Sequence, residues 1–90
     1  MVLFSSPAEK DLKRLPRTVQ EELRLEHIPK LADNPRIGKM LHGPLRGYFS
    51  YDFWSGGTSY RIAYEIMEKD VVILMLKTRD NFYKRFSKRV

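Results

Sequence analysis

The sequence of 90 residues contains no cysteine and only two histidines. The absence of cysteine excludes a disulfide scaffold, a thiolate metal site and a cysteine nucleophile. Two histidines rarely suffice for a histidine-built metal site, so we predict no metal and no cofactor. No apolar run approaches the ~20 residues of a membrane-spanning helix, and we expect no membrane partner. The chemistry of this chain must therefore come from charged, hydroxyl and aromatic side chains.

The first seven residues, Met-Val-Leu-Phe-Ser-Ser-Pro, lack the basic start and the long apolar stretch of a signal peptide. We therefore expect a cytoplasmic protein. A chain of this length has room for one small core, which predicts a single domain over residues 1–90. Apolar residues make up 42% of the sequence and charged residues 31%, as is typical of a folded domain.

Positive charge is in excess, with seventeen Lys and Arg against eleven Asp and Glu, and it is concentrated near the C-terminus. Residues 77–90 hold six basic residues against Asp80, and three aromatic residues lie among them. Interleaved basic and aromatic residues can neutralise phosphates and stack on bases. The alternative is a solvated basic helix whose apolar side docks on the core. The segment therefore indicates either a surface that binds a polyanion such as nucleic acid or an ordinary surface helix.

The first half of the chain reads as two helices. Ser6 can act as an N-cap, Pro7 suits the first helical position, and Glu9 stands where a capping box requires an acidic residue. Pro16 ends this first helix. These residues predict a first helix that begins at Ser6.

A second helix is predicted from about Arg17 to Ala32. Pro29 removes a backbone donor within it, so we expect a kink or an early end there. His27 is interpreted as a structural residue of this helix, and residues 33–35, Asp-Asn-Pro, break it. Residues 2–4 form a short apolar run that can be an edge strand. The two helices are expected to form a hairpin that packs on a sheet.

The second half reads as strands over residues 47–54, 60–67 and 71–76. In the first of them aromatic residues alternate with polar ones, which places Ser50 and Asp52 on one face. Residues 71–76 are apolar at every position, which predicts a central strand covered on both faces. A short helix follows from Asn81. The predicted class is α+β, a helical hairpin on a small, mainly antiparallel sheet, in the order β-α-α-β-β-β-(α).

Three segments together resemble a known family. They are Leu45-Arg46-Gly47, the run Tyr60-Arg61-Ile62-Ala63-Tyr64-Glu65-Ile66, and the stretch from Val71 through Arg79 to Tyr83. In this order and spacing the chain resembles the RelE/ParE superfamily of toxins from toxin–antitoxin pairs, over nearly its whole length. The resemblance implies a RelE-like fold with a concave face and a cognate antitoxin as partner. RelE-like members cut messenger RNA, usually on the ribosome, whereas ParE-like members inhibit DNA gyrase and cut nothing.

For a RelE-like toxin the resemblance implies metal-free cleavage by the ribose 2′-hydroxyl. Arg61 and Arg79 are then the phosphate-stabilising residues, because a guanidinium can contact two phosphate oxygens. Tyr83 matches the tyrosine that stacks on or orients the substrate. The plain alternatives are that Arg61 pairs with Glu65, and that Arg79 is a solvated charge at a strand end. Four further basic residues are predicted to bind substrate: Lys77, Arg46, Lys84 and Arg85.

The sequence departs from the family where the proton acceptor should lie. Ser50 and Asp52 occupy two positions at which the best-known RelE toxins have lysine, and Thr78 stands where many relatives have histidine. Asp52 is a candidate base and is counted among the catalytic residues, although arginines beside it would lower its pKa. His42 is of a residue type suited to acid–base work, but a solvated loop histidine is the alternative. The mRNA interferase is the first interpretation, and a gyrase inhibitor that is not an enzyme is the second.

Overall fold

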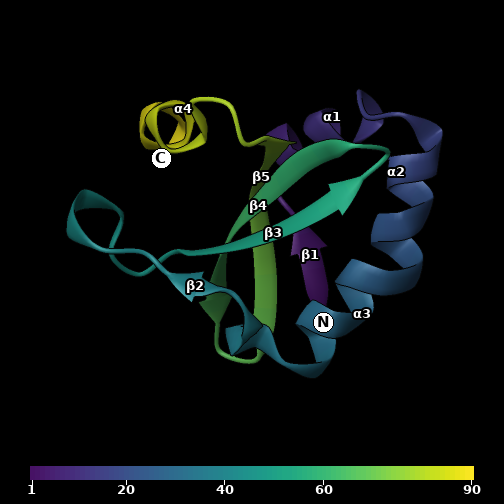
Figure 1. Cartoon of the computed structure of the whole chain (residues 1–90). Helices are drawn as coiled ribbons and strands as arrows, with labels where there is room; N and C mark the ends of the chain where they lie inside the picture. The colour runs from purple at the N-terminus through teal and green to yellow at the C-terminus, as the bar shows by residue number, and fades with distance from the viewer.

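The computed structural model describes residues 1–90, and it confirms the α+β class (Figure 1). Five strands form one sheet in the order β1-β5-β4-β3-β2, and only the pair β1–β5 is parallel. The strands are β1 (Val2–Phe4), β2 (Lys39–Met40), β3 (Phe49–Ser55), β4 (Thr58–Met67) and β5 (Asp70–Thr78). The edge strand β1, the hairpin β3–β4 and the apolar strand β5 were all predicted, whereas β2 was not.

The first helix is α1 (Ser6–Lys13), and its N-cap lies one residue earlier than predicted. Ser5 is the N-cap, and its Oγ accepts a hydrogen bond from the backbone N–H of Ala8 over 3.2 Å. The prediction of Ser6 as the N-cap was therefore wrong. Residue type alone does not decide between Ser5 and Ser6, because serine is a good N-cap residue at either position. Glu9 consequently lies one position beyond the place that a capping box requires.

The second helical segment contains a wide turn before its proline. It consists of α2 (Arg17–Glu22), a π-helical turn η1 (Leu23–His27) and α3 (Ile28–Asp33). A proline inside an α-helix lacks its N–H donor, and its ring collides with the carbonyl four residues earlier. A π-helical turn next to it changes the backbone spacing at that point. The early end expected at Pro29 is absent, because α3 continues to Asp33, and a π-helical turn precedes the proline within a continuous segment.

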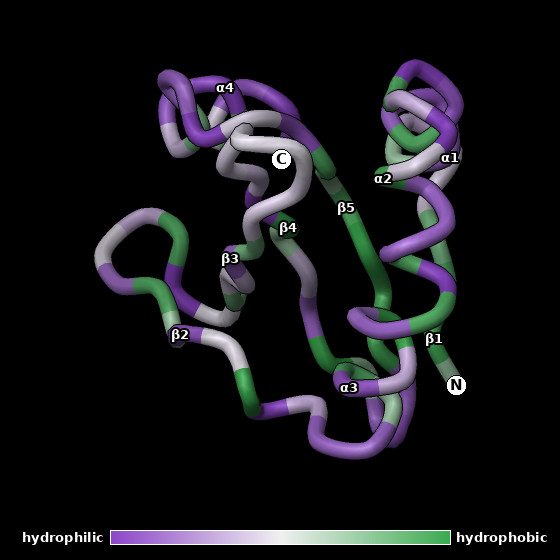
Figure 2. Tube along the Cα trace, turned by 45° about the vertical axis from the view of Figure 1, so that its right-hand side comes forward, coloured by the Kyte–Doolittle hydropathy of each residue, from purple (hydrophilic) through white to green (hydrophobic).

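Two hydrophobic clusters lie on opposite faces of the sheet. The larger one contacts the N-terminal helices and includes Leu23, Ile62 and Ile73. The smaller one lies beneath the C-terminal helix α4 (Phe82–Arg89) and consists of Leu41, Ala63, Met75, Phe82 and Phe86. In Figure 2 the strand β5 is mostly hydrophobic, whereas α4 is mostly hydrophilic. The prediction that residues 71–76 are covered on both faces is confirmed, and β5 is an interior strand between β1 and β4, whereas the middle strand of the sheet is β4.

An ionic contact joins the two ends of the chain along β5. One carboxylate oxygen of Asp11 accepts a hydrogen bond from the backbone N–H of Leu76 (3.0 Å) and one from Arg89 (2.6 Å). Arg89 also donates to the carbonyl of Leu74 (3.0 Å). These side chains hydrogen-bond the part of β5 that extends beyond the short β1. No helix of the structure has the length and apolar character needed to cross a bilayer.

Candidate active site

The site is built on the sheet face that α4 partly covers. Neighbouring residues of a strand point to opposite faces, so Ser50 and Asp52 of β3 share a face with Arg61 of β4. The strand register places Asp52 opposite Arg61 and Arg61 opposite Lys77. The helix α4 then brings Tyr83 over the same face. Two strands, β3 and β4, and one helix thus contribute polar groups to one region.

Arg61 forms a two-point ion pair with Asp52. Its Nε donates to one carboxylate oxygen over 2.6 Å and its Nη2 donates to the other over 3.1 Å. The hydrogen bonds from Arg61 hold the pKa of Asp52 below its ordinary value, and those to Asp52 raise the pKa of Arg61. Both groups are therefore charged at neutral pH. The alternative that Arg61 pairs with Glu65 was wrong, because the register places Asp52 opposite it instead.

Tyr83 covers Arg61 from the side of α4. The guanidinium carbon of Arg61 lies 4.6 Å from the centre of the Tyr83 ring, a distance at which cation and ring attract. The Tyr83 hydroxyl lies 3.2 Å from the Ser50 Oγ, so this hydrogen bond links α4 to β3. Phe82, the neighbouring residue, is fully buried in the smaller cluster and anchors the first turn of α4.

A cleft of about 420 Å³ opens between these groups. It is lined by Ile37, Gly38, Lys39, Ser50, Tyr51, Asp52, Arg61, Arg79 and Tyr83. All four residues expected to be catalytic thus line one cleft. Three cations, Lys39, Arg61 and Arg79, face a single carboxylate there, and an excess of positive charge favours an anionic ligand such as phosphate.

The four predicted substrate-binding residues do not line this cleft. Lys77 directs its Nζ to the Asp11 carboxylate, 3.0 Å away, although its backbone lies beside Arg61. Arg46 is exposed just after the short helix η3 (Gly43–Leu45). Lys84 and Arg85 are exposed on α4. Their placement gives no support to a role in holding substrate inside the cleft.

Lys39 is the cleft residue that sequence reasoning missed. It lies in β2 directly opposite Ser50, so its side chain shares the cleft face. Gly38 allows this close approach, because a Cβ there would come within 2.6 Å of the Ser50 carbonyl oxygen. A strand of two residues has no periodicity that could have revealed it. Lys39 therefore places an ammonium group beside Ser50, on the cleft face.

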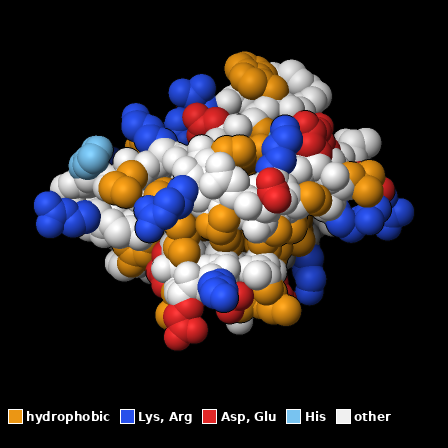
Figure 3. All heavy atoms as spheres, turned by 90° about the horizontal axis from the view of Figure 1, so that it is seen from below, with side chains coloured by type: hydrophobic (Ala, Val, Ile, Leu, Met, Phe, Trp, Pro, Cys, Tyr) orange, Lys and Arg blue, Asp and Glu red, His pale blue; other side chains and the backbone are white.

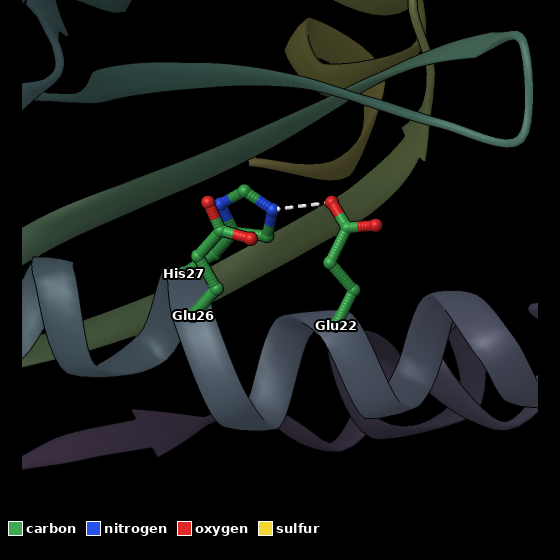
Figure 4. A group of neighbouring side chains, drawn as sticks. All are labelled: Glu22, Glu26 and His27. Atoms are coloured by element: carbon green, nitrogen blue, oxygen red, sulfur yellow. Dashed lines mark hydrogen bonds and ion pairs between the residues drawn. The ribbon is translucent and has the colours of Figure 1, made fainter.

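His27 belongs to a hydrogen-bonded group outside the cleft. Its Nε2 contacts a carboxylate oxygen of Glu22 over 2.8 Å, and its Nδ1 contacts the Tyr51 hydroxyl over 2.7 Å. Figure 4 shows Glu22, Glu26 and His27 side by side on the second helical segment. Their carboxylate oxygens and ring nitrogen, atoms of the kind that can hold a metal ion, lie within 4.8 Å of one another. Both ring nitrogens are engaged and Glu26 pairs with Lys30. These contacts fit the structural role that was predicted for His27.

His42 is exposed and does not line the cleft. It lies in a smaller neighbouring pocket of about 200 Å³, which shares Lys39 and Tyr83 with the cleft. On the face seen in Figure 3, side chains of both charge signs alternate with apolar ones. The excess of positive charge available to a ligand is therefore that of the cleft, where three cations face one carboxylate.

A family model for the ParE-like toxin of type II bacterial toxin–antitoxin systems matches residues 2–87. The chain belongs to this family. It is thus the toxin of a toxin–antitoxin pair in the RelE/ParE/YoeB superfamily, as the sequence motifs predicted. No curated protein sequence matches the chain.

Solved structures agree with the family. The RelBE2 toxin–antitoxin complex from Mycobacterium tuberculosis contains a chain that is 34% identical, with 88% of this toxin and 96% of that chain covered and a TM-score of 0.74. A mutant of the E. coli RelE toxin in the free state is 22% identical, covers 100% and 96%, and has a TM-score of 0.77. The YoeB–YefM complex from Staphylococcus aureus is 18% identical, covers 88% and 95%, and has a TM-score of 0.69. The latter two are similar to this toxin in fold.

Proposed function

We propose that this toxin is a metal-independent endoribonuclease that cleaves messenger RNA, with the ribosome as the place of cleavage. In the reaction the ribose 2′-oxygen forms a bond to the adjacent phosphorus, and the bond from phosphorus to the 5′-oxygen breaks. The products are a 2′,3′-cyclic phosphate and a 5′-hydroxyl, whose oxygen takes its proton from water. The observation that carries the proposal is the convergence of Arg61, Arg79 and Tyr83 on one positively charged cleft.

The two arginines have different parts in this proposal. Arg79 is exposed and forms no ion pair, so its planar guanidinium is available to two phosphate oxygens. Arg61 is fixed by Asp52 and Tyr83 and places a permanent positive charge where the phosphorane develops. Fixed charge of this kind stabilises a transition state because it does not have to reorganise during the reaction.

The proton of the 2′-hydroxyl needs an acceptor. Asp52 is the only carboxylate that lines the cleft, and it is ionised at neutral pH. We assign the proton to Asp52, although its lowered pKa makes it a weaker base than an ordinary aspartate. Lys39 supplies positive charge beside Ser50, in place of a lysine on β3. Tyr83 orients the substrate by contact with a base or a ribose.

The experiment is to mix purified toxin with translating ribosomes and a defined message, in the presence and absence of EDTA, and to map the RNA ends. We expect specific cuts that leave cyclic phosphates and that persist in EDTA. Arg79→Ala should abolish them, whereas Lys88→Ala, an exposed change on α4, should not. An intact message with wild-type toxin would contradict the proposal.

A second function, inhibition of DNA gyrase, is favoured by two observations. Ser50 and Asp52 stand where RNA-cutting relatives have lysines, and the matching family model is named for ParE. Under this alternative the cleft binds a partner without chemistry. Blocked supercoiling by gyrase together with an intact message would assign the toxin to this function.

The partner proposed for this toxin is a cognate antitoxin with an acidic, amphipathic segment. The similar chains from M. tuberculosis and S. aureus were solved as RelBE2 and YoeB–YefM complexes. An acidic segment would complement the cations of the cleft, and its apolar side would pack along the N-terminal helices. Co-purification of the toxin with the product of an adjacent small gene tests this partnership.

A further inference from the structure

The face that forms the cleft continues one row beyond Asp52 and Arg61. In that row Trp54 of β3 lies opposite Ser59 of β4. The backbone N–H of Arg79 donates to the Ser59 carbonyl over 3.1 Å. Trp54, Ser59 and Arg79 therefore follow one another across the sheet. With about 4.8 Å between neighbouring strands, the backbones of Trp54 and Arg79 are about 10 Å apart.

Trp54 has no packing role that would explain its place in this row. Its side chain is on the same face as Ser50 and Asp52, and the residue is 67% exposed. The aromatic residues of β3 that build the core, Phe49 and Phe53, point to the opposite face. The Trp54 ring contacts no other aromatic ring. Single exposed apolar residues are common, but this one adjoins a cationic cleft.

The middle residue of the row is also incompletely satisfied. The Ser59 hydroxyl is buried and has no hydrogen-bond partner, and it is the only buried side-chain polar atom of which this is true. Buried hydroxyls are normally paired. The row thus combines an exposed aromatic ring, an unsatisfied hydroxyl and an arginine without an ion-pair partner. Folding alone requires none of these three features.

We propose that Trp54 forms a nucleotide subsite, in which its indole stacks on a base of single-stranded RNA next to the phosphate that Arg79 binds. The inference rests on the proposed function, because it extends the same cleft. Aromatic rings beside cations are the arrangement that binds single strands, since every base has a face that can stack. Trp54 and Tyr83 then lie on different sides of the phosphate position, and each can hold a base.

The single tryptophan of the chain reports on its own contact. Wild-type toxin is titrated with a short RNA that is 2′-O-methylated, so that it cannot be cut, and that carries a terminal fluorophore. Tryptophan emission and fluorophore anisotropy are followed in the same titration. We expect the emission to fall in parallel with the rise in anisotropy, with one dissociation constant for both signals.

Variants measure how much the contact contributes. Trp54→Ala should weaken RNA binding about 5-fold to 100-fold, whereas Trp54→Phe should retain most of the affinity, because base stacking needs an aromatic face. Leu25→Ala is the matched control, since Leu25 is 65% exposed on the helical side of the molecule. The same three variants are compared in cleavage of message on ribosomes, where the order of rates should match the order of affinities.

The outcomes separate this inference from the function on which it rests. Anisotropy that rises without a change in emission, with Trp54→Ala as active as wild type on ribosomes, overturns the subsite and leaves the nuclease intact. An absence of both RNA binding and cleavage overturns both. A change in emission that follows only addition of antitoxin, or an increase in toxin concentration, would make Trp54 part of a protein interface and would also overturn the subsite.

Discussion

Asp52 holds both carboxylate oxygens against Arg61, and this contact sets the pH range in which the cleft can act. The hydrogen bonds from Arg61 lower the pKa of Asp52 from its ordinary 3.8. A carboxylate with a lowered pKa stays ionised as the pH falls through mildly acidic values. Asp52 would become mostly protonated only at a pH below its lowered pKa in the folded protein.

A pH profile therefore distinguishes the two candidate bases. With Asp52 as proton acceptor, single-turnover cleavage should keep its rate from about pH 8 down to about pH 5. With a histidine as base, the rate should instead fall as the pH drops through the range in which an imidazole gains a proton. Asp52→Asn should lower the rate at every pH, and His42→Ala should leave it unchanged. A rate that halves near neutral pH and loses this dependence in His42→Ala would reassign the proton to His42.

Lys39 and Ser50 lie opposite each other on paired strands, which permits a rescue experiment. Lys39→Ala should reduce cleavage about 10-fold to 100-fold, by loss of one positive group near the phosphate. Ser50→Lys in that background should recover much of the rate, because the lysine returns to the same face from β3. Lys69→Ala, in the exposed turn before β5, is the control. Failure of Ser50→Lys to recover activity would show that the position of the ammonium group on β2 is essential.

At the scale of elements, α4 is held by more than its apolar side. Phe82 and Phe86 pack on the sheet, and Arg89 reaches the buried carboxylate of Asp11. Burial of Asp11 opposes its ionisation, but the hydrogen bonds from Arg89, the Leu76 N–H and Lys77 outweigh it and lower the pKa. The same helix carries Tyr83 into the cleft. The contact between Asp11 and Arg89 therefore positions a site residue from a distance.

Arg89→Ala should lower the free energy of unfolding by about 2–4 kcal/mol at neutral pH, because it leaves a buried carboxylate short of a partner. Asp11 has a lowered folded pKa, so its stabilisation is present above the unfolded value of about 3.8 and is lost as the pH falls through the folded value. Urea unfolding at pH 7 and near pH 3 should thus show that the difference in unfolding free energy between wild type and Arg89→Ala becomes smaller in acid. Arg85→Ala, exposed on α4, should change stability by less than about 0.5 kcal/mol. An equal penalty at both pH values would exclude the carboxylate as the cause.

Elements with a long pattern were predictable, and contacts between distant residues were not. The apolar composition of residues 71–76 predicts a buried strand, and these residues lie within β5. The strand β2 has two residues and so no pattern, which is why Lys39 was missed. Asp11 and Arg89 are 78 positions apart, and no local rule joins them. Arg61, Arg79 and Tyr83 were found through the family resemblance, whereas the partner of Arg61 depended on strand register.

At the scale of the whole molecule, the net charge of +6 divides into cations with different surroundings. Two of the C-terminal cations, Lys77 and Arg89, are engaged by Asp11 and stabilise the fold. The exposed cations of α4 face solvent. The cations in a position to contact a ligand in the cleft are Lys39, Arg61 and Arg79. Binding of RNA should therefore depend on these three charges and not on the total.

This division predicts the salt dependence of RNA binding. Each phosphate neutralised on a single strand contributes about −0.7 to the slope of log K against log salt, so three cleft cations give a slope near −2. Arg79→Ala should reduce the magnitude of the slope by about 0.7, whereas Lys88→Ala should leave it unchanged. Binding of a mainly apolar antitoxin should be less sensitive to salt. Anisotropy titrations at several salt concentrations measure each of these slopes. A slope near −4, reduced equally by Lys88→Ala and Arg79→Ala, would place RNA on the outer face of α4 and remove the cleft from the binding site.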